Sequence, residues 1–248
     1  MIQSVGRAAR ILKALGSESA RLGVTELAER LGLAKATVYG LLRTLEAHQL
    51  VEQDLETGKY RLGPALLQLG NAFLDNNELR ARSLLWAETL AGRAREAVHV
   101  GVLYGPNVLL VHHVFRPDNS LQILQVGASI PWHACALGKA TVAYLDPEGQ
   151  AELLAGPLPR LTGRTLTSRE ALEEALKAVV EDGVALEDQE AIVGEAGIAA
   201  ALFDNRGAVV GAIGLAGPAG WGGAGGSSRS DPGGTSGPGS SIDVIPPS

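Results

Sequence analysis

Residues 34–47, AKATVYGLLRTLEA, are the stretch that most constrains what this chain can fold into. Their apolar residues recur at i, i+3, i+4 and i+7, which is the spacing of one helical face: Val38, Leu41, Leu42 and Leu45. A shorter helix is predicted over residues 24–31, and Gly32 between the two supplies the left-handed backbone that a tight turn needs. The pair is therefore expected to form a helix-turn-helix, whose second helix enters the major groove of DNA.

The residues on either side decide between this motif and an ordinary helical hairpin in an all-helical core. A first helix is predicted over residues 5–15, with Ser4 as its N-cap. After the pair, two short extended runs at residues 50–54 and 59–62 enclose a turn that contains Gly, which is the pattern of a β-hairpin. This order of elements predicts a winged helix-turn-helix over residues 1–63.

The side chains expected to contact DNA lie off the apolar stripe of the second helix and on the outer face of the hairpin. In the second strand of the hairpin, Tyr60 and Leu62 are expected to face the core, so that their neighbours face outward. The predicted DNA-binding residues are Lys35, Thr37, Tyr39, Arg43, Thr44, Lys59 and Arg61. A solvated charged face is the alternative interpretation of this set.

The distribution of charge supports a local DNA-binding surface. The chain has 248 residues, enough for two domains with a core in each, and a net charge of −6, which alone argues against nucleic acid. Residues 1–62, however, carry nine Lys and Arg against seven Asp and Glu, whereas the remainder carries twelve against twenty. A basic head on an acidic body is typical of a protein that contacts DNA at one end.

Composition also predicts where in the cell the protein is located. Cys135 is the only cysteine, so no internal disulfide can form. The sequence has no apolar run of about 18 residues that would predict a membrane span, and no basic-then-apolar export signal at its start. A cytoplasmic protein without membrane contact is expected.

The rest of the chain predicts an α+β fold. A linker helix is expected over residues 64–77, followed by a larger domain over residues 78–216 that opens with a helix at 79–95. Strands are predicted at residues 98–103, 108–115, 121–126, 184–186, 198–203 and 209–215, and helices at 136–145, 148–154 and, after a capping box at Thr167-Ser168-Arg169-Glu170, up to Gly183. An antiparallel sheet with helices beside it indicates a sensing domain. Residues 217–248 are rich in Gly, Ser and Pro and predict a disordered tail.

Catalytic and metal-binding patterns are weak. His133 and Cys135 lie close enough in sequence to suggest a thiol nucleophile with a base, but no third orienting group accompanies them. His112 and His113 would point to opposite faces of a strand, so they cannot easily share one ion. No catalytic residue, metal or cofactor is therefore predicted, although a metal near His99 and the acidic residues around position 188 stays an alternative.

Several segments together resemble the IclR family of transcriptional regulators over nearly all of residues 1–216. They are LAERLGLAKATVYGLLRTLEAHQLVEQ, GKYRLG, IPWHACALGKATVAYL, GVALEDQE, GIAAALFD and GAVVGAIGLAGP. The resemblance implies a winged DNA-binding head, a ligand-sensing domain related in shape to GAF modules, and homodimers or homotetramers on double-stranded operator DNA.

The resemblance also implies an effector pocket formed by residues 131–139, an acidic pair and the two strands that follow. Carried onto this sequence, the effector-binding residues are His133, Ala136, Leu137, Gly138, Asp188 and Glu190. Gly197 stands where the family commonly has cysteine, and Gly214 and Ala216 where it commonly has serine. These differences favour a neutral or phosphorylated polyol over a small carboxylate.

Two further departures concern the helices. Gly40 stands where an arginine is common in the recognition helix, which removes one contact to DNA. Family members continue after the last strand into a final amphipathic helix, whereas this sequence continues into the Gly/Ser/Pro-rich residues. The apolar face of the helix at 79–95 is therefore expected to be partly uncovered.

The sequence predicts a ligand-responsive transcriptional regulator. The first hypothesis is a repressor of a catabolic operon. Glycerol, glycerol 3-phosphate or a small carboxylate is the expected effector. Regulation or activation of an operon for carboxylate or aromatic catabolism is one alternative. A stand-alone small-molecule-binding protein or hydrolytic enzyme is the alternative from another class.

Overall fold

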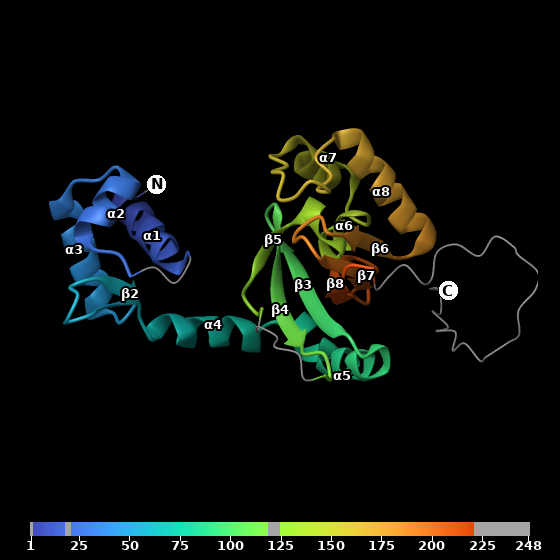
Figure 1. Cartoon of the computed structure of the whole chain (residues 1–248), viewed down its shortest axis with the longest axis horizontal. Helices are drawn as coiled ribbons and strands as arrows, with labels where there is room; N and C mark the ends of the chain where they lie inside the picture. Colours follow the sequence, from blue (N-terminus) through green and yellow to red (C-terminus); the bar gives the residue numbers. More distant parts are fainter. Residues whose placement is uncertain (1, 18–20, 119–124, 221–248) are drawn as a thin grey trace, which may run out of the picture.

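The structure is a computed structural model that describes residues 2–17, 21–118 and 125–220. An N-terminal group of helices lies at one end of the molecule, and helix α4 joins it to a larger unit built on a sheet (Figure 1). The architecture is α+β, as the sequence predicts. Among the described residues, no helix is long and apolar enough to cross a membrane.

The N-terminal unit contains the predicted helix-turn-helix. Its helices are α1 (Gln3–Gly16), α2 (Val24–Leu31) and α3 (Lys35–Ala47). Gly32 adopts the expected left-handed conformation, with φ of 64°, and its N–H bonds the end of α2. The prediction that Ser4 caps α1 is wrong, because the helix already begins at Gln3 and its N-cap, Ile2, makes no side-chain capping bond.

A wing follows the recognition helix. Strand β1 (Val51–Gln53) pairs antiparallel with β2 (Tyr60–Leu62), and Tyr60 also exchanges backbone hydrogen bonds with Leu22. Tyr60 is 1% exposed and belongs to the core, which further contains Ile11, Leu27, Val38, Leu42, Leu45 and Val51. Leu62, in contrast, is 38% exposed, so the prediction that it faces the core is wrong. The buried cluster of this unit includes Tyr60 but not Leu62, whose Cδ1 lies 3.6 Å from the place that a Cβ at Gly16 would take.

The larger unit is built on one antiparallel sheet with the strand order β5-β4-β3-β8-β7-β6 among the described residues. The strands are β3 (Ala97–Tyr104), β4 (Asn107–Val114), β5 (Ser129–Pro131), β6 (Ala185–Asp188), β7 (Glu195–Phe203) and β8 (Val209–Pro218). Of the strand predicted at 121–126, residues 121–124 lie outside the described residues and 125–126 are not in a strand. Strand β8 continues through Gly217 and Pro218, where the tail was expected to begin; residues 221–248 lie outside the described residues.

Helices cover both faces of this sheet. The helices after the linker α4 (Ala65–Asp75) are α5 (Glu78–Ala94), the short 3-10 helix η1 (Trp132–Ala134), α6 (Ala136–Val142), α7 (Pro147–Ala155) and α8 (Arg169–Asp182). Helix α5 packs on one face against Val98, Val100 and Val111, and α6 and α8 pack on the other face against Leu110 and Ala199 (Figure 1). Each face therefore has its own apolar core.

Two helix ends differ from the predictions. Helix α6 ends at Val142 and not at residue 145, because the chain tightens into i→i+3 bonds at Tyr144 and Leu145 just before Asp146-Pro147, where a residue preceding proline disfavours helix. The N-cap of α8 is Ser168, whose hydroxyl accepts from the Ala171 N–H at 3.2 Å; the predicted capping box had Thr167 in this role.

Gly138 sets how closely α6 can approach η1. An added Cβ at this position would lie 2.5 Å from Trp132 Cα, a separation that real side chains essentially never show. We expect Gly138→Ala to lower the free energy of unfolding by about 1–3 kcal/mol, because the backbone of η1 must shift. Urea unfolding measures this. Gly163→Ala is the matched control, since nothing lies within 4 Å of its added Cβ, and equal stability of the two variants would contradict the packing argument.

Candidate functional site

The first candidate surface is the exposed side of helix α3. Lys35, Tyr39 and Arg43 recur every four residues and are all exposed, Tyr39 at 53%. Thr37 is half-buried. Thr44 is exposed, but its hydroxyl donates to the Gly40 carbonyl at 3.1 Å. The helix thus offers a polar and aromatic face directed away from its own core, which is what insertion into a groove requires.

Ion pairs engage the basic residues of the N-terminal unit. Arg43 lies 3.1 Å from Glu46, and Lys59 on the wing lies 3.1 Å from Glu26. Arg61 pairs with Glu52 and Arg21 with Asp54. These pairs are solvent-exposed to different degrees, and exposed pairs contribute about 0–1 kcal/mol. Phosphate groups can therefore replace the carboxylates at little cost.

The second candidate site is a cavity of about 50 Å³ between α6 and strands β7 and β8. Of the predicted effector-binding residues, Ala136 and Leu137 line it. Gly197, Gly214 and Ala216 form part of its wall, so the positions at which the sequence departs from the family pattern do meet at one place.

Glu187 and Glu195 are the acidic residues among those that line this cavity, and the sequence analysis missed both. Glu187 Oε1 accepts from the Ala191 N–H at 3.3 Å, and its Oε2 lies 3.3 Å from where a side chain at Gly197 would begin. Burial raises the pKa of Glu187 to about 7. Side chains alternate along β6, so the buried Ala185 could have indicated that Glu187, two residues on, points inward.

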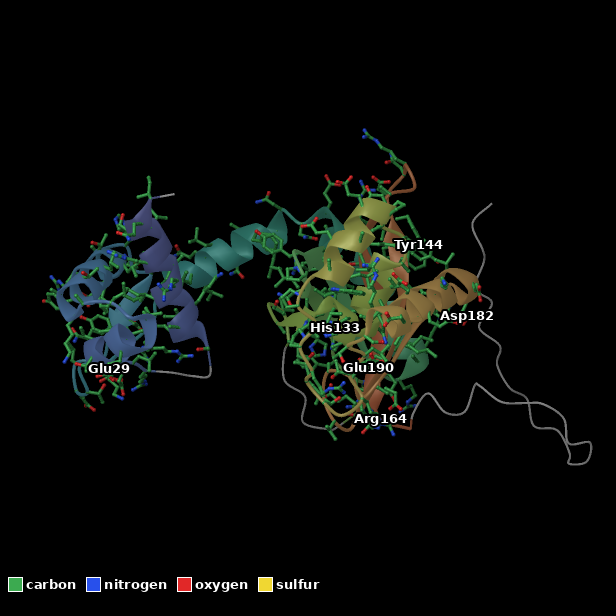
Figure 2. The ribbon with its side chains drawn as sticks, turned by 90° about the horizontal axis from the view of Figure 1, so that it is seen from above. Glu29, His133, Tyr144, Arg164, Asp182 and Glu190 are labelled. Carbon is green, nitrogen blue, oxygen red and sulfur yellow. The ribbon has the colours of Figure 1, made fainter. Side chains whose placement is uncertain are left out.

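Asp188, which the sequence analysis placed in the pocket, lies on the opposite side of β6. It is exposed and pairs with Arg164, which lies at the periphery of the larger unit (Figure 2). The acidic pair 188 and 190 therefore does not converge on one ligand. The physical reason is that β6 ends at Asp188 and the backbone turns at Gln189, whose φ is 58°, so the alternation of the strand does not extend to Glu190.

His133 and Glu190 are buried in the larger unit (Figure 2). Lys139 Nζ donates to Glu190 Oε1 at 2.6 Å, and the two side chains are only 3% and 10% exposed. His133 Nε2 lies 3.0 Å from the Pro159 carbonyl, and Thr165 donates to the Glu190 carbonyl at 2.7 Å. These residues and Gly138 are absent from the lining of the cavity; they hold the loops around it in place.

His99 borders the same cavity, and His113 lies next to it. His99 and His113 are partners across β3 and β4, with ring centroids 4.6 Å apart, and burial lowers the pKa of His99 to about 4. They also line an adjoining cavity of about 350 Å³, together with Gln125, Glu195 and Arg116. His112 faces α5, so the predicted opposite orientation of the neighbouring histidines is confirmed. The described residues contain no group of three His, Cys, Asp or Glu that could hold a metal ion.

Cys135 is not arranged as a nucleophile. Its side chain is buried, and burial raises the pKa of the thiol to about 12. The His133 ring contacts the Pro159 carbonyl and is not hydrogen-bonded to the thiol. A thiol that stays protonated at neutral pH is a weak nucleophile.

Comparison with known proteins places both units in one family. The model of the IclR helix-turn-helix domain matches residues 4–55, and the model of the bacterial transcriptional regulator IclR C-terminal domain matches residues 71–220. The chain therefore belongs to the IclR family, as its motifs suggest. It is a DNA-binding transcriptional regulator and not an enzyme.

Individual relatives agree with this assignment. The glycerol operon regulatory protein of Streptomyces griseus is 48% identical over 217 residues, covering 88% of this chain and 85% of the relative. The glycerol operon regulatory protein of Streptomyces coelicolor is 46% identical over 216 residues, covering 87% and 85%. The crystal structure of an IclR transcriptional regulator from Alicyclobacillus acidocaldarius superposes with a TM-score of 0.77 at 29% identity, covering 88% of each chain.

The raised pKa of Glu187 predicts a pH-dependent stability. The folded carboxyl keeps its proton up to about pH 7, whereas the unfolded one loses it near pH 4.5, so stability present below pH 4.5 is lost as the pH rises to 7. His99 opposes this trend, because its lowered pKa favours the folded state as the pH rises. Comparing a Glu187 variant with the wild type separates the contribution of the Glu187 carboxyl from that of His99, because His99 is present in both proteins.

We expect the stability of Glu187→Gln relative to the wild type to rise between about pH 4.5 and 7 and then level off. Chemical unfolding at a series of pH values measures this difference. Glu181→Gln, an exposed substitution on α8, is the control and should follow the wild type at every pH. Parallel curves for Glu187→Gln and the wild type would contradict the buried position of the carboxyl.

Proposed function

We propose that this regulator is a ligand-responsive repressor of a catabolic operon. The DNA-binding head would comprise residues 1–63, the linker helix residues 64–77 and the effector-binding domain residues 78–216. The observation that carries the proposal is the exposed face of α3 beside the wing, combined with a closed cavity in the other unit. The alternative within the same class is activation of an operon for carboxylate or aromatic catabolism.

On the DNA side, we assign α3 to the major groove and the wing to the phosphate backbone. Lys35, Tyr39 and Arg43 would reach base edges or phosphates from α3, with Thr37 and Thr44 beside them. Lys59 and Arg61 would contact phosphates from β2 and the turn before it. Their present carboxylate partners, Glu26 and Glu52, keep these cations ordered until phosphate displaces them.

The linker helix supports a dimer. None of the residues of α4 is buried, although the helix carries Leu67, Leu69 and Phe73, all of them exposed. An apolar helix of this kind is stable in water when a second copy covers it. We propose a homodimer joined along α4, with a homotetramer as the larger alternative; two heads would then meet operator half-sites about 34 Å apart.

On the effector side, the cavity favours a small neutral polyol, with glycerol as the first candidate. Glu187 and Glu195 line it, and its lining includes no Lys or Arg among the described residues. Lys139, the nearby cation, is already paired with Glu190. A carboxylate or phosphate placed here would meet Glu187 without a compensating charge, so glycerol 3-phosphate and small carboxylates rank lower. The names of the two Streptomyces relatives agree with glycerol.

A chain of packed elements connects the cavity to the head. Strands β3 and β8 contact α5 on their other face, and α5 contacts α4, which leads to the wing. Effector binding that shifts the equilibrium between two placements of α5 would thereby change the spacing of the two heads. The shift is limited to the difference in effector affinity between these two states.

Arg43→Ala tests the DNA-binding surface. If Arg43 contacts phosphate, the variant should bind every duplex sequence more weakly, and the slope of log affinity against log salt should fall by about 1. Loss of preference at a single base pair would indicate direct readout. Gel shift at several salt concentrations measures both effects. Arg169→Ala, which removes an ion-paired arginine from α8, is the control, and unchanged operator binding by Arg43→Ala would refute the assignment.

Comparison of Glu187→Ala with Asp188→Ala tests the effector site. Loss of one hydrogen-bonding group costs about 0.5–1.5 kcal/mol, so the concentration of glycerol that releases operator DNA should rise about two- to tenfold. Asp188→Ala should leave that concentration unchanged, because Asp188 faces solvent. Release of operator DNA is compared for glycerol, glycerol 3-phosphate and 4-hydroxybenzoate. The shift in melting temperature of the protein with each compound is the second measurement. An effect of Asp188→Ala without one of Glu187→Ala would contradict this site.

A further inference from the structure

Helix α5 has an apolar stripe along the edge of its contact with the sheet, where Leu79 and Leu90 pack against the core and Trp86 is exposed. Together with the β7–β8 hairpin, this stripe forms a groove of about 430 Å³, which we call the α5 groove. Its apolar walls are Leu79, Trp86, Leu90, Leu202, Phe203 and Ile213. Trp86 is 71% exposed although it is the largest side chain of the groove. Single exposed apolar residues are common on protein surfaces. An exposed aromatic ring within a continuous apolar groove is not, and it indicates a binding surface.

The chemistry of the rim specifies the occupant further. Arg82 and Arg93 line the α5 groove beside its apolar walls. The carboxylate nearest to Arg82 is Glu78, at 3.8 Å, and both side chains are more than 80% exposed, so this pair is weak. An occupant that fits the groove therefore combines branched aliphatic side chains with a negative charge.

The chain itself contains such a segment. Within residues 221–248 the only branched aliphatic residues are Ile242, Val244 and Ile245, and they flank Asp243. The rest of that stretch is dominated by Gly, Ser and Pro, which have little to bury. We propose that residues 242–245 of this chain bind in the α5 groove, with Asp243 between Arg82 and Arg93.

The length of the connection matches the distance to be covered. Strand β8 and the turn after it run from Ile213, in the groove, to Gly220, seven residues later, which is about 23 Å at the rise of a strand. Residues 221–241 comprise 21 residues. A Gly- and Ser-rich chain of that length has a root-mean-square span of about 25 Å. Such a match gives the highest effective concentration of a tethered segment, in the millimolar range.

Disulfide trapping in the full-length protein tests the assignment. Thr89 lines the groove and is exposed, so Thr89→Cys combined with Val244→Cys should form a disulfide within one chain under mild oxidation. The control pairs Val244→Cys with Lys177→Cys, an exposed position on α8 across the sheet. The native thiol of Cys135 is buried and should not interfere. We expect the groove pair to close at least tenfold faster than the control pair, as resolved on non-reducing gels.

Two outcomes of the trapping experiment would overturn the proposal. One is equal rates for the two pairs. The other is a product that links residues 89 and 244 of different chains. A groove used instead by a second copy would also be revealed by sedimentation, because Trp86→Asp would then dissociate the oligomer.

The charge requirement has its own matched test. Asp243→Lys should slow formation of the groove disulfide several-fold, because it places a cation beside Arg82 and Arg93. Asp231→Lys, which makes the same change outside the aliphatic segment, should leave the rate unchanged. Equal slowing in both variants would overturn the assignment of Asp243 to the groove.

Discussion

The two-sidedness of the antiparallel sheet is the constraint on which the larger unit depends. Each strand sends alternate side chains to opposite faces, and a different helix covers each face: α5 on one and α6 on the other. A bulge between Val100 and Gly101 shifts this alternation within β3 and β4, so His112 turns toward α5 while His113 meets His99 on the face of the cavity. The cavity and the α5 groove are therefore separated by one layer of strands.

Under the proposed mechanism, this layer lies between the cavity and the helix that leads to the head. The buried Lys139–Glu190 pair and the close approach of Gly138 to Trp132 hold α6 tightly on one face. Breaking such a buried pair is costly, by about 3–5 kcal/mol, so this side of the sheet is rigid. Under the proposed mechanism, effector binding would act on the other face, where α5 follows α4 through Asn76 and Asn77.

The N-terminal unit is organised around a single apolar core. Its core of Ile11, Leu27, Val38, Leu42 and Tyr60 uses one stripe of each helix, and what remains on α3 faces solvent. Carboxylates lie beside its basic residues, which reduces attraction to DNA of any sequence. With α3 in the major groove as proposed, discrimination between operator and other DNA would depend more on base contacts than on charge.

Helical period and turn chemistry were enough to predict α1 to α3, the wing and the antiparallel sheet, because these follow from spacing along the chain. Motif resemblance was enough for the family, and it also pointed to Ala136 and Leu137, which line the cavity. It was not enough to separate Glu187 from Asp188, to show that Leu62 is exposed, or to show that His133, Gly138 and Glu190 do not line the cavity. Those outcomes depend on which face of a strand is covered and on which side chains meet across the sheet, and only the packing of elements distant in sequence decides them.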